Sequence, residues 1–387
     1  MFNFKKYNWK KYNVSLVVMV ILLCLISSYA VKCAGGETLG AYFFQHQLMG
    51  LGLGLLVVGV VSILDYHFIC RFAVIYYLFG TLLVAATRFS PLGTDHGTTQ
   101  FRWIAIGGMD FQPSELVKII IVISLSTYFS QMKDRLDKWY TIPLAIVLTA
   151  LPTGFVLVQS DLSSSLVLMF IFGILIFASG ISYKILLPII GVMIPLGLAL
   201  FWYIQQPYQV LLNEYQLDRV NSFIHPEEHS LDGMYQQNNS VDAIAAGGVY
   251  GKLLKDETDG FRGYEYVGVN ESDFVFSVIG EEFGFIGSCM ILGLLALVII
   301  KCLVIAKKAS DYIGMLIAIG IAAMFMFQIF ANIGVATSIL PNTGLPLPFL
   351  SYGLSSMLSS MIGIGLVLNI GLQGEVKEKD DFSLYEL

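Results

Sequence analysis

Long apolar runs, each almost free of charged residues, follow one another along most of the chain. They fall at about 14–33, 45–64, 70–88, 114–131, 141–158, 162–180, 184–203, 274–305, 311–338 and 354–372. About 20 apolar residues in a helix are enough to cross the hydrocarbon core of a bilayer. The pattern therefore predicts an all-α polytopic membrane protein with about ten transmembrane helices.

Composition supports this class and excludes others. Of the 387 residues, 56% are apolar and only 13% are charged, which is about half the charged share of a soluble domain. The runs are continuous rather than alternating, which argues against an outer-membrane β-barrel. There is no basic block of the kind that binds nucleic acid, and the five cysteines show no metal-ligand spacing.

Basic residues set the expected orientation. With a cytoplasmic N-terminus, 14 of the 22 lysines and arginines lie on the cytoplasmic side, in line with the positive-inside rule. We expect both termini in the cytoplasm and read the run from Val14 as a retained first helix rather than a cleaved signal. Residues 1–373 then form one membrane domain and residues 374–387 a short cytoplasmic tail.

Two outer connections are long enough to carry function: residues 89–113 and the large extracellular loop 204–273. The first contains Arg102, Trp103 and Gln112, which suit either an interfacial anchor or a site for an anionic head group. Lys118 follows about one turn inside the next helix, where an ammonium is costly without a partner.

Further polar residues stand near other predicted helix ends. Asp161 is either a helix cap or part of the polar wall of a cavity. Arg219, in the large loop, is either a clamp for phosphate or carboxylate or part of a salt bridge. His225 and His229 are spaced like a metal pair, but Pro226 between them favours surface histidines.

The eighth run begins beside a carboxylate and carries others deeper. Asp273 stands at its outer mouth, with Glu281 and Glu282 roughly 12 Å further along a helix. Intramembrane carboxylates indicate a functional site or require polar partners in the bundle. Residues 341–353, which include Ser351, are too rich in proline and glycine for a helix. They are therefore predicted to form a re-entrant segment that lines a cavity.

Taken together, these motifs resemble the SEDS family, the FtsW, RodA and SpoVE proteins of bacterial elongation, division and sporulation. The motifs occur in one order, at 101–118, 159–166, 215–227, 272–287 and 341–356, and the resemblance covers about residues 50–373. Residues 244–252 and the Leu-Pro-Leu-Pro stretch are most like the RodA type. Departures from the family pattern include Leu354 in place of a glycine, but none falls on Asp273.

The resemblance implies a peptidoglycan glycosyltransferase. Such an enzyme polymerises lipid II, a disaccharide-pentapeptide on undecaprenyl diphosphate, at the outer face of the bacterial cytoplasmic membrane. A class B penicillin-binding protein and membrane lipids are the implied partners. Asp273 matches the essential acid of the family and is the expected general base. Trp103 matches another functionally important position.

The leaving diphosphate requires nearby positive charge, from cations such as Arg102, Lys118 and Arg219 or from a divalent cation (Mg²⁺ or Mn²⁺). No cofactor and no protein metal site are otherwise expected. The predicted substrate-binding residues are Trp103, Arg102, Gln112, Lys118, Asp161, Arg219, Glu281 and Ser351. Two alternatives stay open at this point: a lipid II flippase, and a non-catalytic scaffold for a penicillin-binding protein.

Overall fold

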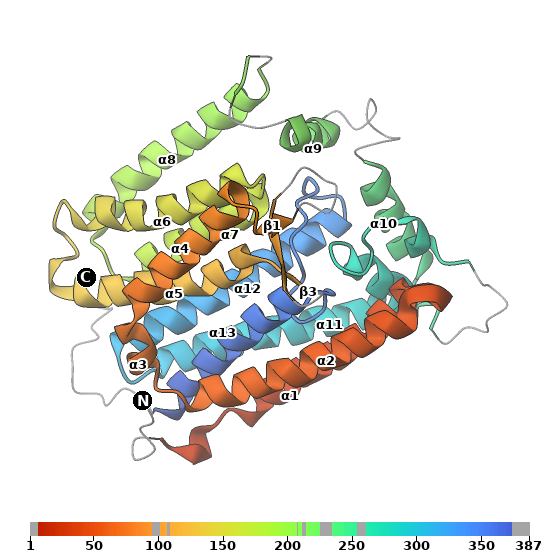
Figure 1. The fold of residues 1–387 in the computed structure, drawn as a ribbon, viewed down its shortest axis with the longest axis horizontal. Helices are drawn as coiled ribbons and strands as arrows, with labels where there is room; N and C mark the ends of the chain where they lie inside the picture. Colours follow the sequence, from red (N-terminus) through yellow and green to blue (C-terminus); the bar gives the residue numbers. More distant parts are fainter. Residues whose placement is uncertain are drawn as a thin grey trace.

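A computed structural model describes residues 7–94, 101–106, 109–206, 208–210, 214–224, 234–253 and 261–373. It is a bundle of helices (Figure 1). Eight of the described helices are long and apolar enough to cross a membrane: α1 (Val14–Ala34), α2 (Gly36–Ile63), α5 (Pro113–Gln131), α6 (Thr141–Val158), α8 (Tyr183–Ile204), α11 (Val275–Lys307), α12 (Tyr312–Ala336) and α13 (Leu354–Leu372). Two shorter apolar helices, α4 (Ala73–Phe89) and α7 (Leu162–Ala178), coincide with the remaining predicted runs.

The predicted helical membrane architecture is confirmed, with two differences in detail. Helix α2 begins at Gly36 rather than at about residue 45, so the connection between the first two predicted helices is largely helical. The loop before α5 contains a small antiparallel sheet that the apolar pattern did not predict. Its strands are β1 (Gly93–Thr94), β2 (Trp103–Ile106) and β3 (Met109–Phe111), in that order.

The other described elements are short and lie before α1 or in the connections between the membrane helices. They are α3 (Tyr66–Arg71), α9 (Glu214–Ile224), α10 (Tyr235–Ala246) and the 3₁₀ turns η1 (Trp9–Lys11), η2 (Lys133–Arg135) and η3 (Gly263–Tyr266). Helices α9 and α10 belong to the large loop. The predicted tail 374–387 and the pair His225 and His229 lie outside the described residues.

The centre of the bundle is formed by α5, α12 and α13, which are the most buried of the spanning helices. Small residues let these helices approach closely: a Cβ on Gly320 of α12 would lie 2.7 Å from Val122 of α5. Such contacts replace the hydrophobic effect as the cause of helix packing in lipid. Helix α8 is the opposite case, because it buries only Leu186 and stands apart from the bundle (Figure 1).

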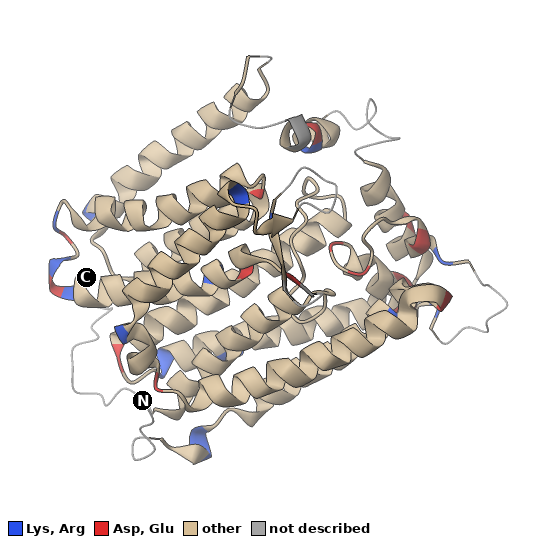
Figure 2. Ribbon diagram, in the orientation of Figure 1, with Lys and Arg blue, Asp and Glu red and all other residues tan. Residues whose placement is uncertain are grey.

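Charged residues gather mainly at the two ends of the bundle (Figure 2). This distribution is the one expected for helices that cross a bilayer. The beginning and end of the described chain meet at one of these ends, because Asn8 donates its N–H to the carbonyl of Leu372 at 2.8 Å.

Helix α11 is interrupted at Gly284 (φ 66°, ψ −168°). In an unbroken helix the N–H groups of residues 285 and 286 would donate to the carbonyls of residues 281 and 282. The loop 247–253, which follows α10, supplies acceptors for these two N–H groups and donors for these two carbonyls. The four bonds are Phe285 N to Gly248 O (2.9 Å), Ile286 N to Val249 O (3.2 Å), Lys252 N to Glu281 O (3.0 Å) and Leu253 N to Glu282 O (3.0 Å). The break in α11 therefore leaves none of these groups unsatisfied and fixes the large loop to the helix.

At the other end of α11, His67 joins two connecting loops. Its Nδ1 lies 2.8 Å from Asp65 and its Nε2 lies 2.5 Å from Asp311, which caps α12. A neutral imidazole has a single N–H, so only the doubly protonated ring donates to both carboxylates. The hydrogen bond to Asp311 raises the pKa of His67, and Asp65 adds to the effect.

We expect His67→Gln to remove a pH-dependent part of the stability. Because the folded-state pKa is raised, the contribution is complete below the unfolded pKa of about 6.5 and is lost as the pH rises through the folded pKa. The size is about 0.5 kcal/mol or less, since the side chain is 44% exposed. Unfolding temperatures of purified wild type and variant should converge between pH 6 and 9. His46→Gln, on the exposed face of α2, should show no such convergence.

Candidate active site

Three distant segments meet at Asp273. Asp273 is half-buried just before α11, Arg219 comes from α9, and Gly344 belongs to the irregular stretch 341–353. A Cβ on Gly344 would lie 3.2 Å from Oδ2 of Asp273 and 3.6 Å from Nη1 of Arg219. The acid and the guanidinium therefore converge over a glycine, whose missing side chain leaves the carboxylate accessible.

The peptide around Asp273 is held from two sides. Asn332, on α12, donates from Nδ2 to the carbonyls of Asp273 (2.8 Å) and Leu345 (2.7 Å). Ser351 donates to the carbonyl of Ser272 at 2.5 Å and accepts from the N–H of Leu347 at 2.7 Å. Both side chains thus connect the irregular stretch to the start of α11, which fixes the position of the carboxylate.

Residues 341–353 are non-helical and largely buried in protein, as predicted. Gly344 (φ 68°) and Phe349 (φ 66°) both have left-handed backbone conformations, which are costly for a residue with a Cβ. Gln47 of α2 donates to the carbonyl of Ser351 at 3.2 Å. Contacts from several helices satisfy backbone groups that a helix would otherwise satisfy internally.

Arg102, Gln112 and Asp161 form a polar wall next to this stretch. Arg102 donates from Nε to the carbonyl of Gln159 at 3.2 Å and from its guanidinium to the carbonyl of Ser160. Gln112 donates to Oδ2 of Asp161 at 3.2 Å, while Oδ1 of Asp161 caps α7 by accepting the N–H of Ser164 at 3.0 Å. Asp161 is therefore both a cap and a wall residue.

Two further contacts complete this wall. Ser163, the second residue of α7, donates to the carbonyl of Thr343 in the irregular stretch. Trp103, on β2, is half-buried and follows Arg102 directly. The structure thus brings together the motifs of the loop before α5, the α6–α7 turn and residues 341–353.

Lys118 and Glu281, both predicted to bind substrate, contact charged and polar protein groups in the structure. Lys118 lies 2.6 Å from Glu115, and both side chains are buried. Glu281 accepts from Lys252 at 2.5 Å and from the N–H groups of Gly263 and Tyr264 at 2.9 Å. These partners offset the cost of burying the charges. In this arrangement Glu281 connects Lys252, Gly263 and Tyr264 to α11, and substrate binding by Lys118 and Glu281 stays a prediction.

The electrostatics around Asp273 favour a base of moderate strength. Burial raises the pKa of its carboxyl, and the nearby Glu271 raises it further. Arg219, a hydrogen bond from Ser272 and the more distant Arg102 act in the opposite direction. A raised pKa brings a carboxylate closer to the ideal for proton abstraction near neutral pH.

Arg219→Gln is expected to move the acidic limb of the pH–activity profile to higher pH. The guanidinium stabilises the charged carboxylate, so its loss raises the pKa of Asp273 and more alkaline conditions are needed to deprotonate the base. The profile of kcat/KM against pH, measured by lipid II consumption, tests this. Arg88→Gln removes an outer arginine that stacks on Phe101 and should leave the limb in place. If the acidic limb of the profile is unchanged in the Arg219 variant, this arginine does not influence the pKa of the base.

Among the described residues, no cluster of three or more histidine, cysteine or acidic side chains is suited to hold a metal ion. The divalent cation stays a prediction. Asn332 and Gly344 were not predicted as site residues. The available signals were an amide within an apolar helix for Asn332 and a glycine in a proline-rich stretch for Gly344.

Comparisons with known proteins agree with this geometry. The chain matches the family of FtsW, RodA and SpoVE proteins, described as cell cycle proteins, over residues 9–375. It is 31% identical to the probable peptidoglycan glycosyltransferase FtsW of Trichlorobacter lovleyi, over 95% of this chain and 94% of the relative. It is 29% identical to the peptidoglycan glycosyltransferase MrdB of Escherichia coli K12, over 95% of each chain.

Solved structures give the same result. A chain of a peptidoglycan synthase complex that coordinates polymerization and crosslinking superimposes with a TM-score of 0.76 at 28% identity, covering 94% of this chain and 97% of the other. The rod shape determining protein RodA of Thermus thermophilus superimposes with a TM-score of 0.67 at 26% identity, covering 94% and 98%. The chain therefore belongs to the FtsW/RodA/SpoVE family.

Proposed function

We propose that this protein is a peptidoglycan glycosyltransferase that polymerises lipid II at the outer face of the bacterial cytoplasmic membrane. The observation that carries the proposal is the convergence of Asp273 and Arg219 over Gly344 at the mouth of α11. The relatives named FtsW and MrdB are both called peptidoglycan glycosyltransferases, which agrees with a catalytic role for this acid.

The proposed reaction uses the acid and the arginines in different ways. A sugar hydroxyl oxygen attacks the anomeric carbon of lipid II, and its proton passes to the carboxylate of Asp273. The bond between the anomeric carbon and the diphosphate breaks, and the electron pair leaves with the diphosphate. Arg219 and Arg102 stabilise the growing negative charge. A divalent cation, if bound by the diphosphate, would add to this charge stabilisation.

The location of the site suits a substrate that stays anchored in lipid. Asp273 lies where a spanning helix begins, so a sugar diphosphate reaches it while the lipid tail remains in the bilayer. The distribution of lysine and arginine supports the proposal that this end faces outside and that both termini lie in the cytoplasm. A class B penicillin-binding protein is the proposed partner, and the elongation role is favoured by residues 244–252.

Two other functions make different demands on the structure. A flippase needs a polar path to the cytoplasmic leaflet, yet the buried pair Lys118 and Glu115 is closed on itself inside α5. A scaffold needs no acid, whereas Asp273 is held by Asn332 and faced by Arg219. The polymerase uses all these features.

The test is lipid II polymerisation by the purified protein, with and without a co-expressed class B penicillin-binding protein. Glycan strands should form with wild type and disappear with Asp273→Ala, while the folding and partner binding of the variant persist. If wild type forms no strands with any partner but moves lipid II between the leaflets of vesicles, the flippase replaces the polymerase. Strands that persist in the variant would remove Asp273 from the reaction.

A further inference from the structure

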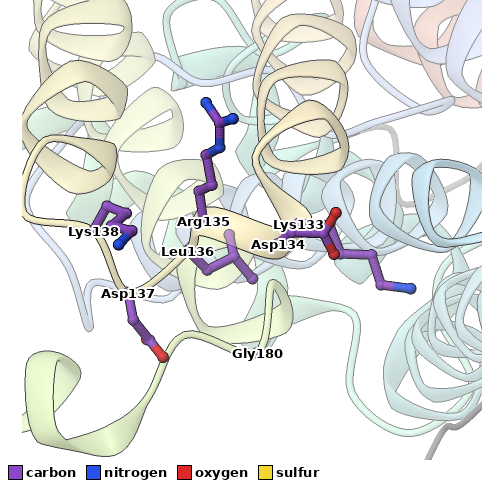
Figure 3. A pocket seen from close by; sticks show the side chains of 7 residues that line it. All are labelled: Lys133, Asp134, Arg135, Leu136, Asp137, Lys138 and Gly180. Atoms are coloured by element: carbon purple, nitrogen blue, oxygen red, sulfur yellow. The ribbon is translucent and has the colours of Figure 1, made fainter.

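We propose that a cavity at the end of the bundle opposite Asp273 binds the phosphate of an anionic phospholipid. The cavity, of about 280 Å³, lies between the α5–α6 connection and the α7–α8 turn (Figure 3). It is lined by Lys133, Asp134, Arg135, Leu136, Asp137, Lys138 and Gly180. None of these residues belongs to the site around Asp273, and the proposal does not depend on the proposed catalytic activity.

The lining carries positive charge that is available to a ligand. Lys133, Arg135 and Lys138 fan out from one short turn (Figure 3). None of the three has a carboxylate within ion-pair distance in the part of the chain that the structure describes, although Lys133 lies 5.6 Å from the ring centre of Tyr312. Asp137 is engaged elsewhere, since it accepts the N–H of Ser182 at 3.2 Å. The three cations outnumber the two carboxylates of the lining, Asp134 and Asp137, so the cavity carries a net charge of +1. The three basic side chains point in different directions, but they are long enough to turn toward a phosphate bound beside the turn.

The backbone adds to the attraction for an anion. Helix α6 begins at Thr141, next to this turn, and no side chain caps its first turn. The N–H of Thr141 donates to the carbonyl of Lys138 at 3.1 Å and Pro143 has no N–H, so the attraction of this end for a negative charge comes mainly from the helix dipole. This is a second source of positive potential, independent of the three side chains.

The surroundings indicate a lipid rather than a free phosphate. Trp139 is 84% exposed and Tyr183, the first residue of α8, is 64% exposed, as is typical of aromatic side chains at a membrane interface. Leu144 of α6 and Leu187 of α8 continue an exposed apolar surface from there. A phosphate in the cavity thus leaves room for acyl chains along both helices, and basic pockets at this depth suit anionic head groups.

The experiment measures lipid binding to the full chain in a neutral detergent. Native mass spectrometry follows titration with phosphatidylglycerol, with phosphatidylcholine as the zwitterionic reference and inorganic phosphate as competitor. Wild type should retain phosphatidylglycerol in preference to phosphatidylcholine. The triple variant Lys133→Gln, Arg135→Gln, Lys138→Gln should bind it 10- to 100-fold more weakly, given the usual contribution of each basic residue.

A matched control removes the same charge from other exposed positions at this end of the bundle: Lys10→Gln, Lys11→Gln, Lys307→Gln. It should bind phosphatidylglycerol within about threefold of wild type. Arg135→Gln alone, at an exposed position, is a second test if the triple variant does not fold. Equal weakening in the control, or equal retention of phosphatidylcholine, would overturn the proposal. Displacement of the lipid by low concentrations of inorganic phosphate would overturn the proposal of a lipid ligand and would indicate a site for free phosphate.

Discussion

Asp273→Asn is expected to lower the rate of glycan polymerisation by about 10²- to 10⁴-fold, the usual contribution of a general base. The amide has nearly the shape of the carboxylate, so the bonds from Asn332 to the carbonyl of residue 273 and to that of Leu345 can persist. Because removal of a half-buried charge costs little stability, the unfolding temperature should stay near that of wild type. The measurement is kcat for lipid II polymerisation, with unfolding followed in the same detergent.

Two further variants separate a base from a general charge effect. Asp242→Asn removes an exposed acid of α10 in the same large loop and should keep nearly full activity. Asp273→Glu keeps a carboxylate that can accept the proton, so it should retain more activity than the amide. Its longer side chain meets Gly344 closely, so it should be less active than wild type. Activity of the amide equal to that of wild type would show that another group takes the proton.

The sequence predicted the membrane helices well because their signal is local. An apolar run of sufficient length forms a helix in lipid whatever its neighbours are, and each run coincides with one of the described helices. The start of α5 at Pro113 and the cap at Asp161 follow equally local rules. Asp273 was identified through the resemblance of its motif to the essential acid of the family, because a carboxylate at the mouth of a helix is by itself equally well explained as a cap.

Partners far apart in the chain were not predictable in the same way. Glu281 is neutralised by Lys252, 29 residues away, and Asp273 meets Arg219 and Gly344 from opposite directions along the chain. Such pairs depend on how helices pack, which the apolar pattern does not encode. For the same reason the sequence alone shows that Glu281 is an acid inside an apolar run but not which cation lies beside it.

The break in α11 shows a second limit of pattern analysis. The run 274–305 is apolar apart from Glu281, Glu282 and Lys301 and predicts one long helix. A glycine with positive φ cannot be distinguished from a helical glycine in that pattern. Only the packing of the 247–253 loop against the helix shows which of the glycines in α11 is required.

Among substitutions of a glycine of α11 by alanine, Gly284→Ala is therefore expected to destabilise the protein most. Its φ of 66° with ψ of −168° lies in a region that is essentially accessible to glycine alone. The added Cβ would also lie 2.2 Å from the backbone nitrogen of Gly251, too close for any adjustment of a side chain to relieve. We expect a loss of more than about 3 kcal/mol, seen as a markedly lower unfolding temperature and yield.

Gly293→Ala provides the matched comparison within the same helix. Its added methyl group would meet nothing within 4 Å, and alanine is favoured over glycine in a helix by up to about 1 kcal/mol. This variant should unfold at or slightly above the wild-type temperature. If the two variants instead unfold together, α11 can straighten at little cost, and the four bonds to the 247–253 loop do not hold the large loop against the helix that carries Asp273.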